Sequence, residues 1–181
     1  MDIGNNSDQP MGLKFGPIVL LPEIEKRHLF TLFFGAFFGI ASMAFVNVFN
    51  YSIFSALGIP QEEFGSVAGT LTAVQEVVVV SVIGLFGALS DKIGRRFVYS
   101  LGFFLLGIGY FIYPLADSTT ELYFFRIFVA LGCAANTVML PTVANDYVHG
   151  STRGRLIAFT SILNGLGLVL IISTFRNFAT F

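Results

Sequence analysis

Five long apolar stretches, separated by short polar segments, dominate the hydropathy pattern of the chain. Each is about as long as the roughly 20 residues that an α-helix needs to cross a bilayer. They cover Leu29–Ile53, Gly65–Leu89, Phe97–Ala116, Leu122–Ala144 and Leu156–Phe175. Because the segments between them are short, successive helices are expected to be antiparallel neighbours in one bundle. The pattern predicts an all-α, polytopic membrane protein with its bundle in residues 29–181, after a cytoplasmic segment at residues 1–28.

The composition agrees with a lipid environment. Hydrophobic residues make up 55% of the chain and charged residues 12%, so a soluble globule would expose too much apolar surface to water. A single cysteine, Cys133, and two histidines give no basis for a disulfide framework or a metal centre. No cofactor is expected. The net charge of −1 is uninformative about nucleic acid, and no such partner is expected.

A short apolar stretch at Phe15–Pro22 precedes the first predicted span. It is far too short to cross a bilayer. It contains proline near its start, at Pro17, and at its end, at Pro22. It also makes a poor signal peptide, because the acids Asp2 and Asp8 come before it in place of a basic start. The first span is therefore expected to serve as an uncleaved targeting signal.

Basic residues alternate between loops in a way that predicts orientation, because Lys and Arg in short loops stay on the cytoplasmic side. The segments before the first span, between the second and third, and between the fourth and fifth carry Lys14, Lys26, Arg27, Lys92, Arg95, Arg96, Arg153 and Arg155. The opposite loops, at residues 61–63 and 117–121, contain acids and no cation. We expect a multi-pass protein of the plasma (inner) membrane with a cytoplasmic amino terminus and an outer carboxyl terminus.

A glycine- and charge-rich loop lies between the second and third spans. Its defining positions are Gly87, Leu89, Asp91, Lys92, Gly94, Arg95 and Arg96. On physical grounds Gly87 permits close helix contact, Asp91 is able to accept hydrogen bonds from a nearby helix start, and Gly94 permits a tight turn. The alternative is that this loop is a charged turn whose only role is to set the orientation of the chain in the membrane. The loop resembles the signature of the major facilitator superfamily, which implies the amino-terminal part of such a transporter. In that family the aspartate and bases help to hold the cytoplasmic gate, partly against a second half.

Two further stretches resemble the same family. Arg126 is followed by small residues four and six positions later, Ala130 and Gly132, which resembles the family's helix-four pattern with Ala130 in place of the more usual glycine. Asp146 and Arg153 form a second cytoplasmic acid and arginine pattern, similar to that of many sugar porters. By contrast, the fifth span lacks the glycine-proline signature of drug exporters, which makes drug-proton antiport less favoured.

Glu76 lies near the middle of the second span, where an ionised carboxylate costs about 2.5 to 3.5 kcal/mol on insertion scales. It is therefore expected to face a cavity, to pair, or to be protonated. A functional interpretation makes it a proton-coupling or substrate-contact residue. The structural alternative is a protonated carboxyl group that is hydrogen-bonded between helices, with Gln75 as a partner.

Arg126 and three asparagines complete the candidate polar residues. Arg126 either buries its stem while its head reaches the outer interface, or faces a cavity and binds an anionic substrate or an ionised Glu76. Asn47 and Asn50 share a helix face and, with Asn136, are candidate substrate contacts. Each is also explained by a helix-to-helix hydrogen bond worth about 1 kcal/mol.

Glycine pairs on the first two spans have the small-xxx-small spacing that permits close helix crossing, at Gly35 and Gly39 and at Gly65 and Gly69. Packing is the role expected for them.

The favoured function is transport of a small, unidentified solute by a secondary carrier, with this chain as a fragment, truncated form or half-subunit. Five spans do not make a six-helix half, so a second helical half or a partner membrane protein is expected. The rival is a non-transporting scaffold or assembly partner with the family's fold. An enzyme is not expected, because no histidine pair, carboxylate pair or nucleophile-base pattern falls at one depth within the spans.

Overall fold

The computed structural model describes residues 14–178, with side chains to residue 174, and nearly all of this region is helical. The five long helices are α1 (Lys26–Ala56), α2 (Phe64–Ile93), α3 (Arg95–Ile112), α4 (Thr119–Tyr147) and α5 (Arg153–Phe178). Single 3-10 turns precede α2, follow α3 and precede α5, at Gln61–Glu63, Tyr113–Leu115 and Gly150–Thr152. All five helices are long and apolar enough to cross a bilayer. The prediction of an integral, multi-pass helical protein is confirmed.

Local sequence explains how two of the connections are made. Gly94 alone separates α2 from α3, and its φ of 97° lies in a region that side chains disfavour. The turn expected at Gly94 is therefore confirmed. At the start of α4, the Ser118 side chain accepts a hydrogen bond from the Glu121 backbone N–H at 3.3 Å, which caps that helix.

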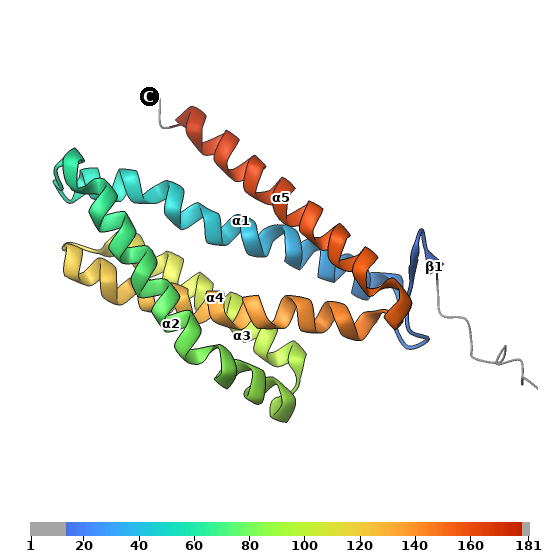
Figure 1. Ribbon diagram of the computed structural model, residues 1–181. Coiled ribbons are helices and arrows are strands. Elements are labelled where there is room, and N and C mark those ends of the chain that lie inside the picture. The colour runs from blue at the N-terminus through green and yellow to red at the C-terminus, as the bar shows by residue number, and fades with distance from the viewer. Residues whose placement is uncertain (1–13, 179–181) are drawn as a thin grey trace, which may run out of the picture.

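Helix α4 is the centre of the bundle (Figure 1). Helices α2 and α3 both pack along α4, whereas α5 packs chiefly on α1. Helices α2 and α5 consequently leave most of their apolar surface uncovered by the rest of residues 14–178. We call the end with the α2–α3 and α4–α5 connections the basic end, and the end with Glu62, Glu63, Asp117 and Glu121 the acidic end.

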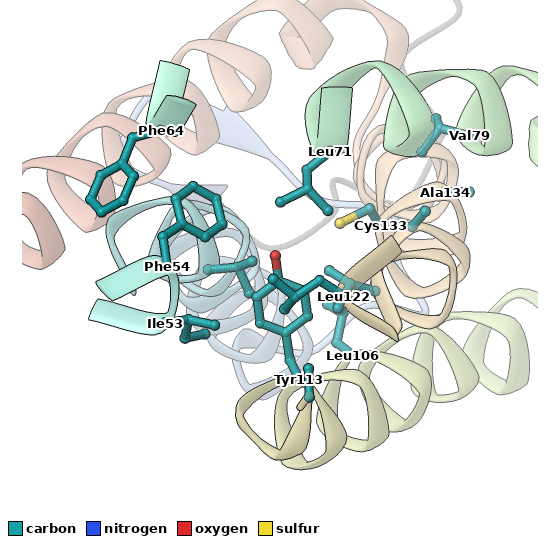
Figure 2. Packing of buried hydrophobic residues seen from close by; sticks show 14 residues of the cluster. Ile53, Phe54, Phe64, Leu71, Val79, Leu106, Tyr113, Leu122, Cys133 and Ala134 are labelled. Carbon is teal, nitrogen blue, oxygen red and sulfur yellow. The ribbon is translucent and has the colours of Figure 1, made fainter. Parts of the chain in front are cut away.

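Toward the acidic end, buried side chains of α1 to α4 form the main apolar cluster (Figure 2). Its members include Ile53, Phe54, Leu71, Leu106, Tyr113, Leu122 and Cys133. Figure 2 shows the Tyr113 ring in the middle of these residues. The cluster therefore surrounds a phenol hydroxyl that needs a hydrogen-bond partner.

Glycines bring α3 and α4 into close contact. A Cβ atom on Gly132 would lie 2.6 Å from the backbone nitrogen of Leu106, and one on Gly109 would lie 3.0 Å from that of Val129. Larger residues at either position would push the two helices apart.

Only some of the glycines that were expected from their spacing to allow close helix contact do so. A Cβ atom on Gly35 would collide with the Tyr99 hydroxyl of α3, so packing at Gly35 is confirmed. Nothing in the described chain lies within 4 Å of a Cβ placed on Gly65, Gly69 or Gly87. The close contacts expected at these three positions are therefore wrong for residues 14–178, because the faces of α2 that carry them have no neighbour there.

A small hairpin accounts for the short apolar stretch that precedes α1. Strands β1 (Lys14–Phe15) and β2 (Ile18–Val19) pair antiparallel, and Leu20 bridges to Val148 just after α4. Ile18 and Leu20 are fully buried against residues of α1, α4 and α5. The segment is thus part of the packed basic end (Figure 1). Residues 1–13 of the predicted cytoplasmic segment lie outside the described residues.

Candidate functional site

Arg126 lies two turns into α4 and is completely buried. Its Nη2 donates a hydrogen bond of 2.6 Å to Oδ1 of Asn47 on α1. Its Nε and Nη1 atoms are also buried and have no hydrogen-bond partner within residues 14–178. The interpretation in which the guanidinium reaches the outer interface is therefore wrong, because the packing of α1 and α4 holds the charge inside the bundle.

Tyr113 completes this arrangement, which we call the Arg126 cluster (Asn47, Asn50, Tyr113 and Arg126). The Tyr113 hydroxyl donates a 2.9 Å hydrogen bond to Oδ1 of Asn50, and both side chains are buried. The guanidinium carbon of Arg126 lies 5.8 Å from the Tyr113 ring centroid. Asn47 and Asn50 do share a face of α1, as expected, but they contact different partners. Sequence reasoning missed Tyr113, and its only signal was a tyrosine followed by proline at a span end.

The charge of Arg126 is poorly compensated. A buried guanidinium is costly unless an acid and several acceptors surround it. Here it has one amide oxygen and an aromatic face, and a cation–π contact supplies about 0.5 to 2 kcal/mol. No carboxylate of the described chain forms an ion pair with Arg126. Chemically, the site is a desolvated cation with N–H donors that have no partner in the described chain, which is an arrangement suited to binding an anion.

Glu76 does not reach Arg126. It is exposed on α2, and no ion pair or hydrogen bond of its carboxylate is formed within residues 14–178. Asn136, ten positions beyond Arg126, is buried and donates from Nδ2 to the Gly132 carbonyl at 2.9 Å.

At the basic end, Arg95 of the signature loop forms an ion pair with Asp146 of α4. This pair joins two segments that the sequence singled out separately, whereas Arg153, the other member of the acid and arginine pattern, is exposed. Asp91, Lys92 and Arg96 are exposed as well. Asp91 accepts no hydrogen bond from the start of α3 within the described residues, because Gly94 turns the chain so that α3 begins without a side-chain cap.

The family model of the Major Facilitator Superfamily matches residues 18–174, a region that holds all five helices, the signature loop and the Arg126 cluster. The chain belongs to the major facilitator superfamily. No solved structure matches it.

Curated relatives of this superfamily chain include transporters. It is 29% identical to the magnetosome protein MamH of Paramagnetospirillum magneticum over 125 residues, 65% of the chain and 29% of MamH. It is 26% identical to the riboflavin transporter RibZ of Clostridioides difficile over 139 residues, 77% of the chain and 30% of RibZ. A probable inorganic phosphate transporter of Arabidopsis thaliana, 1-8, is 31% identical over 93 residues, 48% of the chain and 17% of the relative.

This superfamily chain thus spans less than a third of the length of each of these relatives. Membership and relatives together support a general transporter role and no particular substrate. Histidine, cysteine and carboxylate side chains do not gather in threes anywhere in residues 14–178, so this part of the chain offers no ready metal centre.

Proposed function

We propose that this chain supplies the first helices of a secondary active carrier for a small solute, and that Arg126 binds a negatively charged group of that solute. The observation that carries the proposal is the fully buried guanidinium, two of whose nitrogen atoms have no hydrogen-bond partner within residues 14–178. Phosphate transporters among the relatives act on an anion, which agrees with this role.

A path to Arg126 is consistent with the exposure of its neighbours. Asn47 is exposed although its amide oxygen contacts the buried guanidinium, so the hydrogen bond leads from Arg126 to the surface of the bundle. Glu76 of α2 and Thr137 of α4 are exposed as well, well inside their spans. Polar side chains at such depth are unfavourable against lipid and favour a water-filled pathway or further protein.

Further helices complete the carrier in this proposal. Carriers of this superfamily place the substrate near the midplane between two halves, each built from two inverted three-helix repeats. The chain matches less than a third of each relative's length and contains five spans. The exposed polar side chains of α1, α2 and α4 would then face the second half.

Glu76 is the proposed coupling residue. As an exposed carboxylate at mid-span, it is placed to exchange a proton with water in a pathway.

The test is uptake of radiolabelled inorganic phosphate by membranes that contain the complete transporter. Arg126→Gln is expected to lower saturable uptake by about 10- to 100-fold, because a hydrogen bond to a charged group contributes about 1.5 to 3 kcal/mol. Arg126→Lys should retain part of the saturable uptake. Arg153→Gln, which changes an exposed arginine, should leave uptake at the wild-type level. Glu76→Gln should flatten the pH dependence of uptake. Unchanged saturable uptake by Arg126→Gln would refute the anion site, and absence of any solute flux would favour the scaffold role.

A further inference from the structure

We propose that the bundle contains a second binding site, for a small uncharged ligand with hydroxyl groups, in a cavity lined by α1, α3, α4 and α5. The cavity has a volume of about 210 Å³. Residues that line it include Gly35 and Gly39 of α1, Tyr99 of α3, Asn136 of α4 and Asn164 of α5. None of the residues that line it is charged.

Three polar atoms of the cavity wall have no partner within residues 14–178. They are the hydroxyl of Tyr99, Oδ1 of Asn136 and Oδ1 of Asn164, and all three are buried. Only 3% of Asn136 is exposed. Its Nδ2 is held by the Gly132 carbonyl, which fixes the amide orientation and leaves the oxygen free. A buried acceptor without a partner costs about 1 to 3 kcal/mol, so a ligand that donates hydrogen bonds would be stabilised there.

Glycine gives the phenol its position. The Tyr99 hydroxyl lies directly against Gly35, where a Cβ atom would collide with it. Gly39, one turn along the same face of α1, keeps the wall free of a side chain. The small residues of α1 therefore both admit the hydroxyl and leave room beside it.

The chemistry of the wall selects the ligand class. Two amide oxygens would repel an anion, and a cation would be buried without an opposite charge among the residues that line the cavity. A hydroxyl group is able to donate to an asparagine oxygen and to accept from Tyr99. At liquid-water density the volume corresponds to about seven water molecules, which suits a short polyol or the hydroxylated end of a larger solute.

This site is separate from the Arg126 cluster. Asn136 is ten positions after Arg126, about 15 Å along α4 at the rise of an α-helix. The polyol site is therefore independent of whether Arg126 binds an anion.

The experiment is saturation-transfer difference NMR on the chain in lipid nanodiscs, with four probes of matched size. Ethylene glycol is the neutral donor, acetone a neutral molecule without donors, acetate the anion and isopropylammonium the cation. We expect saturable transfer to ethylene glycol and none to the other three. Equal signals from all four, or from none, would overturn the proposal, the latter leaving an internal water cluster as the content of the cavity.

Variants link the signal to the cavity. Tyr99→Phe and Asn164→Leu keep the size of the side chain and remove one hydrogen-bonding group each, so each should weaken ethylene glycol binding about fivefold. Tyr51→Phe, at a side chain that is 67% exposed, is the matched control and should change nothing. Arg126→Gln should also leave ethylene glycol binding intact. Loss of binding in Tyr51→Phe or in Arg126→Gln, with none in Tyr99→Phe, would contradict the assignment.

Discussion

Arg95 and Arg126 are placed in opposite ways. Arg95 pairs with Asp146 at the basic end, where about two-fifths of each side chain is exposed to solvent. Arg126 is completely buried and contacts no acid of the described chain. Stability alone would favour the reverse arrangement, since a buried ion has the greater need of a counter-charge. Arg95 thus joins neighbouring helix ends, whereas the burial of Arg126 without an acid in the described chain is what the proposed anion site would explain.

The largest effect on stability and uptake is expected when Arg126 is given an acidic partner, as Arg95 has in Asp146. Asn47→Asp would put a carboxylate at the atom that already contacts Arg126 at 2.6 Å, and should raise the free energy of unfolding by about 1.5 to 3 kcal/mol. The same change should abolish phosphate uptake, because the new carboxylate would neutralise the charge of the guanidinium and repel an anion. Thermal melting in nanodiscs measures the first effect. Asn50→Asp, one turn away and bonded to Tyr113, is the control and should stabilise nothing.

Loss of the hydrogen bond between Tyr113 and Asn50, two uncharged residues of the Arg126 cluster, is expected to have an intermediate effect on stability. Tyr113→Phe removes the hydroxyl that donates to the buried Asn50 and should lower the free energy of unfolding by about 1 to 3 kcal/mol, because an acceptor is left unsatisfied. Chemical denaturation in mixed micelles is a suitable measurement. A variant as stable as the wild-type chain would show that Asn50 finds another donor and that the Tyr113 bond does not help to build the cluster.

The smallest effect is expected at the basic end. A double-mutant cycle with Arg95→Gln and Asp146→Asn should give a coupling energy of about 0.2 to 1 kcal/mol, which falls as salt is added, because both side chains are partly exposed. Arg153→Gln in place of Arg95→Gln should show no coupling to Asp146. A coupling above about 2 kcal/mol would erase the contrast between the two arginines.

Hydropathy was sufficient to predict the five spans, and the loop from Gly87 to Arg96 was sufficient to suggest the family. These signals are local, because span length and a tight turn are encoded in consecutive residues. Arg126 was also identified as a candidate from the sequence, since any charge within a span is conspicuous.

Partners across helices were not predictable. Asn47 meets Arg126 and Asp146 meets Arg95 only because of how α1, α3 and α4 cross and rotate, and a single sequence does not record those rotations. Glycine spacing was misleading on α2 for the same reason. Gly65 and Gly69 have the expected separation yet face no neighbour in the described chain, whereas Gly109 and Gly132 make the close contacts. The spacing indicates that one face of a helix lacks bulky side chains, but it does not indicate which helix packs against that face.

The most direct test of the central claim is the melting temperature of the chain in nanodiscs, measured against inorganic phosphate concentration for the wild type and for Arg126→Met. Without phosphate, Arg126→Met should melt at a higher temperature, because it removes an uncompensated buried charge and keeps much of the side-chain volume. Added phosphate should raise the melting temperature of the wild type in a saturable way and leave that of Arg126→Met unchanged. A wild-type chain that melts above Arg126→Met at every phosphate concentration, with no response to phosphate, would show that Arg126 is a structural residue and would contradict the account.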